Sequence, residues 1–328
     1  MTSTSTVLIL GASGRLGNAC VHAFAERGWQ VVAQTRKPVT APFPARVIAF
    51  VTGTEPIEKA CTKLQKVDIV VHASNPAYTN AAWLAQIPAM MQSAIDIAQA
   101  LNATLMFPGN VYNFGSDMPG LLDEGAAQRP TTVKGKLRVN AELALKHSAQ
   151  ATGLRAVVIR AGDFFGGEDG SGSGSMFDRV TVCKIKKGTF THAGPLDVAT
   201  PWAYLPDLAR TFVLVAERRQ QLATFEVLHF AGHHINSRDW LTALQPLAAA
   251  NGWVAKGQML KTVTLPWQVM RVMGWFSPTY SSLLEMRYLH NTPHALSNTR
   301  LRKLLGAEPH TPLATAAASA LKNLGFLR

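Results

Sequence analysis

The chain has 328 residues, 47% of them hydrophobic, and a formal net charge of +12. This length suits one large domain or two closely packed ones, and no apolar run reaches the roughly 18 residues of a membrane-spanning helix. The N-terminal segment lacks the basic residues of a signal peptide. Its three cysteines, Cys20, Cys61 and Cys183, are too scattered for a metal or redox pair. We therefore expect a cytoplasmic protein with no metal site and no membrane segment.

The positive charge attracts anions in general, and a phosphate-rich ligand, a nucleic acid or a solvated basic surface would each account for it. Basic residues are spread along the chain, and the one tight cluster, Lys184, Lys186 and Lys187, lies among apolar residues. The sequence contains no recognisable nucleic-acid-binding module. We expect a small-molecule substrate and no nucleic-acid partner.

Residues 6–17 combine a short apolar run with three regularly spaced glycines. The run at 7–10 predicts a buried strand, and Gly11, Gly14 and Gly17 follow it directly. A helical pattern then begins and ends at Gly28. A strand that turns through glycines into a helix exposes backbone N–H groups to a pyrophosphate, so this stretch predicts dinucleotide binding.

The first half of the chain alternates strand and helix patterns. A second strand is predicted at 30–35, and further strands at 46–51, 68–72, 103–107, 155–160 and 225–230. Helices are predicted at 55–64, at 80–101 with Pro88 kinking or dividing it, and at 134–152. Such crossovers indicate an α/β fold with a doubly wound parallel sheet.

The pattern changes after residue 160. Residues 166–175 are rich in Gly and Ser and predict a flexible loop, either a plain surface loop or a lid over a pocket. From residue 233 onward the sequence reads as mainly helical. The aromatic stretch 265–280 predicts a small-domain core or a subunit contact.

Several motifs now occur in a familiar order. They are Gly11–Gly17, 68–73, Val111-Tyr112 with Gly115, 160–166, 202–209 and 304–306. With them the chain resembles the extended short-chain dehydrogenase/reductase superfamily, in its NAD-dependent epimerase/dehydratase group. The resemblance implies a Rossmann-like sheet with a smaller, mainly helical C-terminal substrate domain, and a homodimer through two long helices.

We expect the dinucleotide-binding domain over residues 1–165, with a later strand within about 200–232. The substrate-binding domain is expected over 166–199 and 233–328. The predicted cofactor-binding residues are Gly11, Ser13, Gly14, Arg15, Leu16, Gly17, Thr35, Arg36, Ala73, Ser74, Pro108, Gly109 and Asn110. Asn75 and Asp163 are the predicted substrate contacts, although Asp163 could simply cap the following turn.

The residues after the second strand bear on the choice of cofactor. An acidic residue there would accept a hydrogen bond from the ribose 2′-hydroxyl of NAD. This chain instead has Thr35 and Arg36, and Arg36 could pair with a 2′-phosphate, helped by Arg15. An exposed basic turn is the alternative. The residues favour NADP over NAD.

The catalytic positions depart from the superfamily. The resemblance implies a Ser or Thr after the strand at 103–107 and a Tyr-x-x-x-Lys on the next helix, but Pro108 or Gly109 occupies the first place. Matching Pro130, Gly135 and Glu142 puts Lys134 at the Tyr position and Arg138 at the Lys position. A register shifted by two residues gives Thr132 and Lys136, again without a tyrosine.

Three residues are therefore catalytic candidates. Lys134 could transfer a proton only if burial or nearby cations lower its pKa, whereas Arg138 stays protonated and can only position negative charge. Tyr112 could substitute for the missing phenol or merely pack. We expect an NADP-dependent oxidoreductase or epimerase-like enzyme acting on a small carbonyl, hydroxyl or nucleotide-sugar-like compound. The alternative is a non-catalytic NADPH-binding regulator or scaffold.

Overall fold

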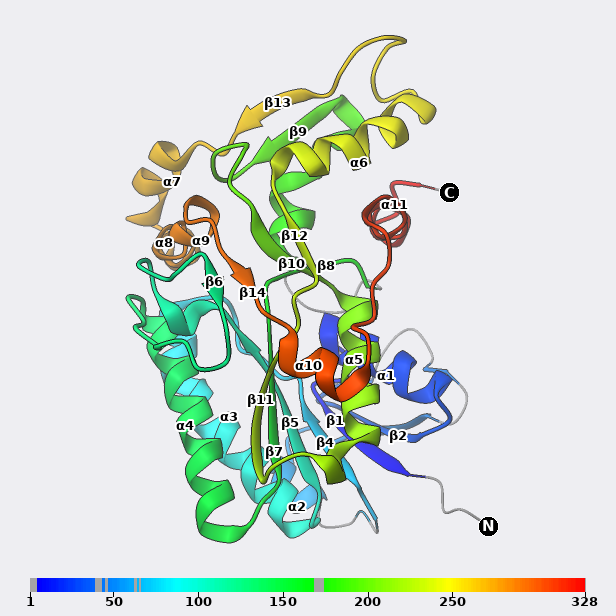
Figure 1. The fold of residues 1–328 in the computed structure, drawn as a ribbon, viewed down its shortest axis with the longest axis vertical. Coiled ribbons are helices and arrows are strands. Elements are labelled where there is room, and N and C mark those ends of the chain that lie inside the picture. The colour runs from blue at the N-terminus through cyan, green and yellow to red at the C-terminus, as the bar shows by residue number, and fades with distance from the viewer. Residues whose placement is uncertain are drawn as a thin grey trace.

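Figure 1 shows the computed structural model, which describes residues 5–38, 43–44, 47–61, 64, 66–167 and 174–327. Its main sheet has seven strands in the order β11-β7-β5-β4-β1-β2-β3, and every pair is parallel. The strands are β1 (Thr6–Leu10), β2 (Gln30–Thr35), β3 (Val47–Val51), β4 (Ile69–His72), β5 (Thr104–Asn110), β7 (Ala156–Ala161) and β11 (Phe225–His229). The predicted doubly wound parallel sheet is confirmed.

Helices cover both faces of this sheet, as Figure 1 shows. One face packs on α1 (Arg15–Glu26) and α5 (Leu205–Glu217), and the other on α2 (Ile57–Cys61), α3 (Asn80–Ala100) and α4 (Val133–Thr152). Within β1, Val7 and Ile9 join the first core while Leu8 and Leu10 join the second. This alternation follows from the two-residue period of a strand, and it explains why a strand buried on both faces reads as a continuous apolar run.

Most of the remaining elements lie above the sheet in Figure 1, around a third core rich in aromatic residues and a smaller fourth core that includes Leu122, Leu289 and Leu296. Small sheets follow the orders β12-β10-β8, β13-β9 and β14-β6. Their strands are β6 (Leu121–Leu122), β8 (Asp163–Phe165), β9 (Thr189–His192), β10 (Thr200–Tyr204), β12 (His233–Ile235), β13 (Lys261–Thr264) and β14 (Ala295–Leu296). The longer helices are α6 (Ser237–Ala250), α7 (Trp267–Gly274), α8 (Pro278–Glu285), α10 (Thr299–Leu305) and α11 (Leu313–Asn323). The sequence predicted the helices beyond residue 233 but not the short strands between them.

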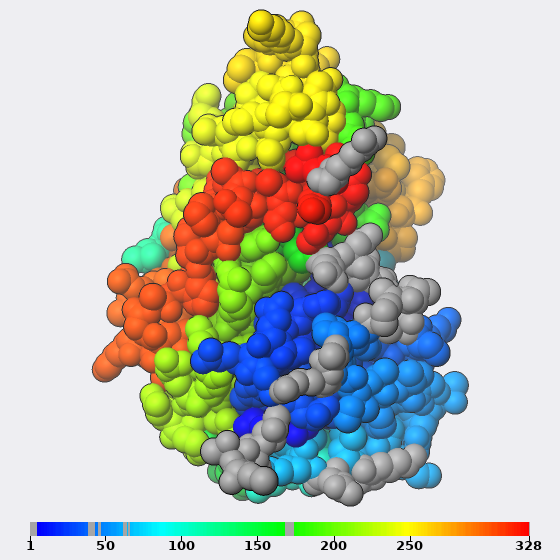
Figure 2. All heavy atoms as spheres, turned by 90° about the vertical axis from the view of Figure 1, so that its right-hand side faces the viewer, coloured from blue at the N-terminus to red at the C-terminus, as the bar shows by residue number. Residues whose placement is uncertain are grey.

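The C-terminal helices join the two parts of the molecule. Figure 2 shows these residues, in red and orange, lying between the yellow surface of α6 and the green and blue surface of α5 and α1. Helix α10 packs against β11 and α5, and α11 packs against α6. Short helical segments complete the chain: η1 (Tyr112–Phe114), η2 (Phe177–Thr181), η3 (Ile185–Lys187), η4 (Arg219–Gln221) and α9 (Tyr288–Asn291).

Two predictions about local structure need correction. Pro88 does not divide its helix, because α3 is continuous from Asn80 to Ala100. Proline has no N–H to donate to the carbonyl four residues earlier in the helix. Because Pro88 is exposed, water can donate a hydrogen bond to that carbonyl instead. The strand predicted at 103–107 is longer and continues as β5 to Asn110, so Pro108 and Gly109 lie within it. Pro108 is tolerated there because β5 pairs with β4 only as far as Met106 and beyond that with β7 alone.

Parts of other predictions fall on residues outside the description. The helix predicted at 55–64 is described as Ile57–Cys61, and residue 46 and most of the Gly/Ser-rich loop, 168–173, lie outside the described residues. Within the part of the chain that is described, every helix is too short or too polar to cross a lipid bilayer.

The core between α4 and the sheet gives a stability test. Leu145 has no exposed surface, so Leu145→Ala should lower the free energy of unfolding by about 2–5 kcal/mol by leaving a cavity. Leu143, on the same helix, is 44% exposed, and Leu143→Ala should change that free energy by about 0.5 kcal/mol or less. Urea denaturation of both variants measures the difference, and equal losses would contradict this packing.

Candidate functional site

The glycine turn between β1 and α1 has the geometry that its sequence predicts. Gly11 has a positive φ of 76°, and its N–H donates to the Gln34 side chain at 3.1 Å. A Cβ at Gly17 would lie 2.2 Å from the Gly11 carbonyl oxygen, and a Cβ at Gly11 would lie 2.6 Å from Ser74 Oγ. These contacts exclude side chains from the turn and bring the end of β4 against it.

The first turn of α1 is suited to an anion. Its N-cap residue, Gly14, provides no side-chain hydrogen bond, and the first turn contains no acidic residue. The helix start therefore keeps its partial positive charge, which favours a phosphate group. Together with the close approach of backbone at Gly11 and Gly17, this fits the pyrophosphate of a dinucleotide.

The two arginines that favoured NADP lie in different surroundings. Arg36 is exposed directly after β2. Arg15 forms an ion pair with Asp178, at 2.5 Å from Nη1 to Oδ2, and donates from Nη2 to the Gly166 carbonyl at 2.7 Å. Arg15 thus joins the glycine turn to the segment after β8, while Arg36 faces solvent.

Lys134 lies in the first turn of α4, deep in the protein. The Thr132 side chain caps this helix by accepting from the Gly135 N–H at 3.0 Å. A Cβ at Gly135 would lie 2.5 Å from the Tyr112 carbonyl oxygen, so glycine is needed for α4 to approach η1. The Lys134 side chain has no exposed surface, and its Nζ donates to Asn80 Oδ1 at 2.5 Å.

Burial changes the chemistry of this amine. Desolvation lowers the pKa of Lys134 to about 8, and the nearby Glu285 carboxylate opposes only part of that shift. The amine also lies 4.6 Å from the centre of the Tyr78 ring. Burial thus lowers the pKa of Lys134, which is the direction that proton transfer near neutral pH requires.

Arg138 follows one turn later and connects the ends of three elements. Its guanidinium donates to Asn75 Oδ1 at 3.2 Å and to the Pro108 carbonyl at 3.4 Å. It also stacks over the rings of Trp83 and Phe107, at 4.9 and 5.2 Å. Arg138 therefore holds α4 against the exits of β4 and β5, with its charge close to the site.

Two tyrosines meet beside these cations. The hydroxyl groups of Tyr112 and Tyr78 lie 3.3 Å apart. Burial, and then the Asp163 carboxylate, raise the pKa of Tyr112 to about 12, and burial raises the pKa of Tyr78 well above its usual value. Both phenols are therefore neutral near pH 7 and can donate hydrogen bonds.

Asp163, the first residue of β8, completes the site. Its Oδ2 lies 3.8 Å from His290 Nδ1, and the burial of His290 lowers the pKa of that ring. The neighbouring Glu285 carboxylate accepts from the Val133 N–H at 2.5 Å and from the Asn80 side chain at 2.7 Å.

The structure brings the candidates Lys134, Arg138, Tyr112, Asn75 and Asp163 to one end of the sheet. Five partners in the site were not predicted from the sequence: Tyr78, Asn80, Glu285, Tyr288 and His290. The first two could have been suspected, because they lie between the predicted strand at 68–72 and the first residue of the next predicted helix. The others come from a segment about 200 residues away and carried no local signal.

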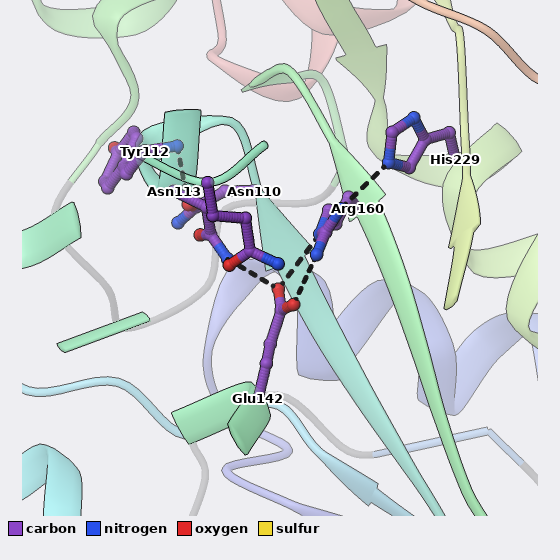
Figure 3. Close-up of polar contacts among 7 residues, drawn as sticks. Asn110, Tyr112, Asn113, Glu142, Arg160 and His229 are labelled. Atoms are coloured by element: carbon purple, nitrogen blue, oxygen red, sulfur yellow. Dashed lines mark hydrogen bonds and ion pairs between the residues drawn. The ribbon is translucent and has the colours of Figure 1, made fainter. Parts of the chain in front are cut away.

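A buried ion pair lies behind the site and is drawn in Figure 3. The Arg160 Nη2 donates to Glu142 Oε2 at 2.6 Å, and Asn113 Nδ2 donates to Glu142 Oε1 at 3.0 Å. His229 Nδ1 donates to the Leu122 carbonyl at 3.2 Å, so its Nε2 can accept from Arg160 Nη1 at 3.3 Å. Burial and Arg160 lower the pKa of His229 to about 3, so the ring is neutral and this arrangement is stable.

This network explains why a glycine stands near the end of β5. A Cβ at Gly109 would lie 2.6 Å from the Arg160 side chain, so a larger residue would displace it. The Asn110 side chain accepts from the Tyr112 N–H at 3.0 Å and orders the turn that carries this tyrosine. Gly109 and Asn110, predicted to bind cofactor, thus make packing and turn contacts here, while Pro108 bonds Arg138 through its carbonyl.

Comparisons with known proteins agree with this geometry. A family model described as the NAD dependent epimerase/dehydratase family matches residues 7–231. UDP-glucuronic acid 4-epimerase from Bacillus cereus in complex with NAD superposes with a TM-score of 0.74 at 14% identity, covering 98% of each chain. UDP-glucose 4-epimerase from Brucella ovis in complex with NAD gives 0.72 at 17% identity, again over 98% of each chain.

L-threonine dehydrogenase from Phytophthora infestans superposes with a TM-score of 0.73 at 16% identity, covering 98% of this chain and all of its own. No protein in the curated set matches the sequence. At such low identities the solved structures establish the shared fold and leave the substrate open.

The buried ion pair gives a test of its structural role. Glu142→Gln should leave the Arg160 charge without its anion and lower the free energy of unfolding by about 3–5 kcal/mol. Glu217→Gln, at the surface pair with Arg27, is the matched control and should barely change the urea midpoint. A Glu142→Gln protein as stable as the control would contradict this assignment.

Proposed function

The chain belongs to the NAD dependent epimerase/dehydratase family, and from this premise we propose that it is a nicotinamide-dependent oxidoreductase whose proton-transfer group is the Lys134 amine. The observation that carries the proposal is the burial of Lys134 at the motif position of the missing tyrosine, with a pKa lowered to about 8. A group with a pKa near the working pH can both give and accept a proton, which is what acid–base catalysis requires.

The residues present fit a dinucleotide. The turn at Gly11 and Gly17 admits close contact, and the uncapped start of α1 favours a pyrophosphate. When bound, the nicotinamide donates or accepts the hydride. The chain itself must bind and orient the substrate and transfer one proton.

The proton step follows from the contacts of Lys134. Reduction of a carbonyl group needs a proton on its oxygen, which the Lys134 ammonium supplies; oxidation of a hydroxyl group needs a base, which the neutral amine supplies. The substrate oxygen replaces Asn80 Oδ1 as the partner of Nζ. Tyr112 is the weaker candidate, because a pKa of about 12 makes it a poor base near neutral pH.

We also propose that NADP is preferred. Support comes from Arg36, an exposed cation directly after β2, at the place where an acidic residue would favour NAD. Arg15 is excluded from this role as long as it pairs with Asp178. The preference thus depends on one arginine.

Cofactor titration tests the preference. NADPH should bind more tightly than NADH, and Arg36→Ala should weaken NADPH binding about tenfold while leaving NADH unchanged, because it removes a charged contact to the 2′-phosphate. Lys37→Ala, one residue further into the exposed turn, is the matched control. Equal affinities for the two cofactors in the unaltered protein would refute the NADP preference.

Substitution of Lys134 tests the proton donor. Lys134→Met should lower kcat about 10²- to 10⁴-fold without weakening cofactor binding. Lys134→Arg keeps the positive charge but cannot release the proton, so it should be equally impaired. Lys136→Ala, on the exposed side of the same turn, should keep full activity. An active Lys134→Arg enzyme would exclude this role.

The rates of reduction and oxidation should depend on pH in opposite directions. The rate of reduction should fall as the pH rises through about 8, because the ammonium form is lost. The rate of oxidation should rise over the same range, because the neutral amine is gained. Profiles of kcat in both directions measure these limbs, and they should disappear in Lys134→Met.

The second candidate function is a non-catalytic, cofactor-binding regulator. The observation that favours it is the lack of a phenol at the motif position, with Lys134 held by Asn80 in its place. Tight NADPH binding without turnover of carbonyl compounds of any charge would support this function and overturn the proposed one.

A further inference from the structure

Glu285, the last residue of α8, contacts the starts of two other helices. Its two carboxylate oxygens have separate partners: Oε1 accepts from the Val133 N–H at 2.5 Å, and Oε2 accepts from Asn80 Nδ2 at 2.7 Å. Val133 begins α4 and Asn80 begins α3, and neither helix has an acidic residue in its own first turn. Glu285 therefore supplies the negative charge that a helix start favours.

Helix α8 holds Asn80 at a second point. The Asn80 backbone N–H donates to Ser282 Oγ at 3.1 Å, and Ser282 is fully buried. Ser282 and Glu285 are three residues apart and so lie on the same face of α8. In Figure 1 this helix lies above the upper end of α4. Both the backbone and the side chain of Asn80 are thus fixed by a segment about 200 residues further along the chain.

The Glu285 carboxylate decides which way the Asn80 amide faces. A carboxylate only accepts hydrogen bonds, so the part of the amide next to it must be the NH₂ group. The amide oxygen then faces Lys134 and accepts from its Nζ at 2.5 Å. With the opposite orientation, the NH₂ group would face the amine and the oxygen would face the carboxylate, and both hydrogen bonds would be lost.

The Asn80 amide also separates Lys134 from a direct ion pair with Glu285. An amide oxygen accepts a hydrogen bond from the ammonium and from the neutral amine alike, because both carry N–H groups. A carboxylate in direct contact would strongly favour the ammonium. Desolvation is the larger influence on Lys134, and the charge of Glu285 opposes only part of it, which leaves the pKa at about 8.

The other polar groups around the amine leave Glu285 as the anion that acts on it. Arg138, one turn later on α4, is a second cation, and its guanidinium lies over the Trp83 ring. Three phenols lie around these groups and are neutral near pH 7, because burial raises their pKa values: Tyr78, Tyr112 and Tyr288.

We propose that Asn80 and Glu285 are positioning residues for the Lys134 amine. Glu285 orients the Asn80 amide, and the amide oxygen holds Nζ in place until a substrate oxygen replaces it. Helix α8, from the C-terminal part of the chain, thereby sets the position of a proton-transfer group that α4 carries. This assignment rests on the proposed function, in which Lys134 transfers the proton.

The titration of Lys134 tests this assignment without a substrate. In protein whose lysines carry ¹³C at Cε, the signal absent from Lys134→Met identifies Lys134, and its chemical shift follows the protonation of the amine. We expect a midpoint near pH 8 in the unaltered protein. Glu285→Gln should lower it by about one unit, because the ammonium loses a nearby anion.

Asn80→Leu separates the amide from the charge. It keeps Glu285 and removes the acceptor of the ammonium, so it should also lower the midpoint by about one unit. In the double variant the shift should be smaller than the sum of the two single shifts, because residues that act through one contact are not additive. Fully additive shifts would mean that Glu285 acts by its charge alone and would overturn its orienting role.

Glu308→Gln is the matched control. The Glu308 carboxylate also accepts from two backbone N–H groups and one asparagine amide, at Ala231, Gly232 and Asn298. Its loss removes the same kinds of contact at the end of β11, so it should leave the Lys134 midpoint unchanged. An equal shift in Glu285→Gln and Glu308→Gln would overturn the assignment, because it would reflect a general loosening of the fold.

The outcomes separate this assignment from the proposed function. Shifted midpoints in Glu285→Gln and Asn80→Leu, without turnover of any carbonyl compound by the unaltered protein, would support the positioning role and overturn the oxidoreductase. Turnover by the unaltered protein, with the same midpoint in both variants, would leave the oxidoreductase intact and overturn the positioning role. A midpoint near 10 in the unaltered protein, about the ordinary lysine value, would also overturn the positioning role.

Discussion

The buried ion pair between Glu142 and Arg160 fixes helix α4 against the sheet. Removing two charges from water is costly, and this pair offsets the cost only because Asn113 and His229 complete its hydrogen bonds. The constraint acts over a distance, because Lys134 and Arg138 lie on the same helix, about two turns and one turn before Glu142 respectively. A helix held at this point cannot slide along the sheet, so the amine stays in its dry position beside Tyr78.

In the proposed mechanism the buried Lys134 amine takes the place of the tyrosine that the family resemblance implies beside a lysine. To transfer a proton near neutral pH, a tyrosine and a lysine both need a pKa lower than their usual value near 10. The tyrosine is charged when deprotonated, whereas the lysine is charged when protonated. Desolvation moves the two groups in opposite directions: it raises the pKa of Tyr112 and lowers that of Lys134. The same dry surroundings thus make the phenol less suited to proton transfer and the amine more so.

The fold was predictable from sequence because its signals are local. The apolar strand, the glycines and the helix that follows occupy adjacent residues, and the helix predicted at 134–152 is observed as α4, Val133–Thr152. Residues brought together by the C-terminal part were not predictable, since Glu285 reaches Val133 across 152 positions and Asp178 reaches Arg15 across 163. Of the two effects predicted for Pro88, division of the helix is wrong, because the effect of a proline depends on which side of α3 faces solvent.

The unequal lengths of β4 and β5 have a consequence for how this architecture diversifies. Beyond Met106, β5 keeps β7 as its strand partner and pairs with no strand on its other edge among the described residues, so backbone pairing sets where the ends of β4 and β5 separate. Side chains around this point of separation can be exchanged without breaking a ladder of hydrogen bonds. Proteins sharing only 14–17% of their residues with this chain retain its fold.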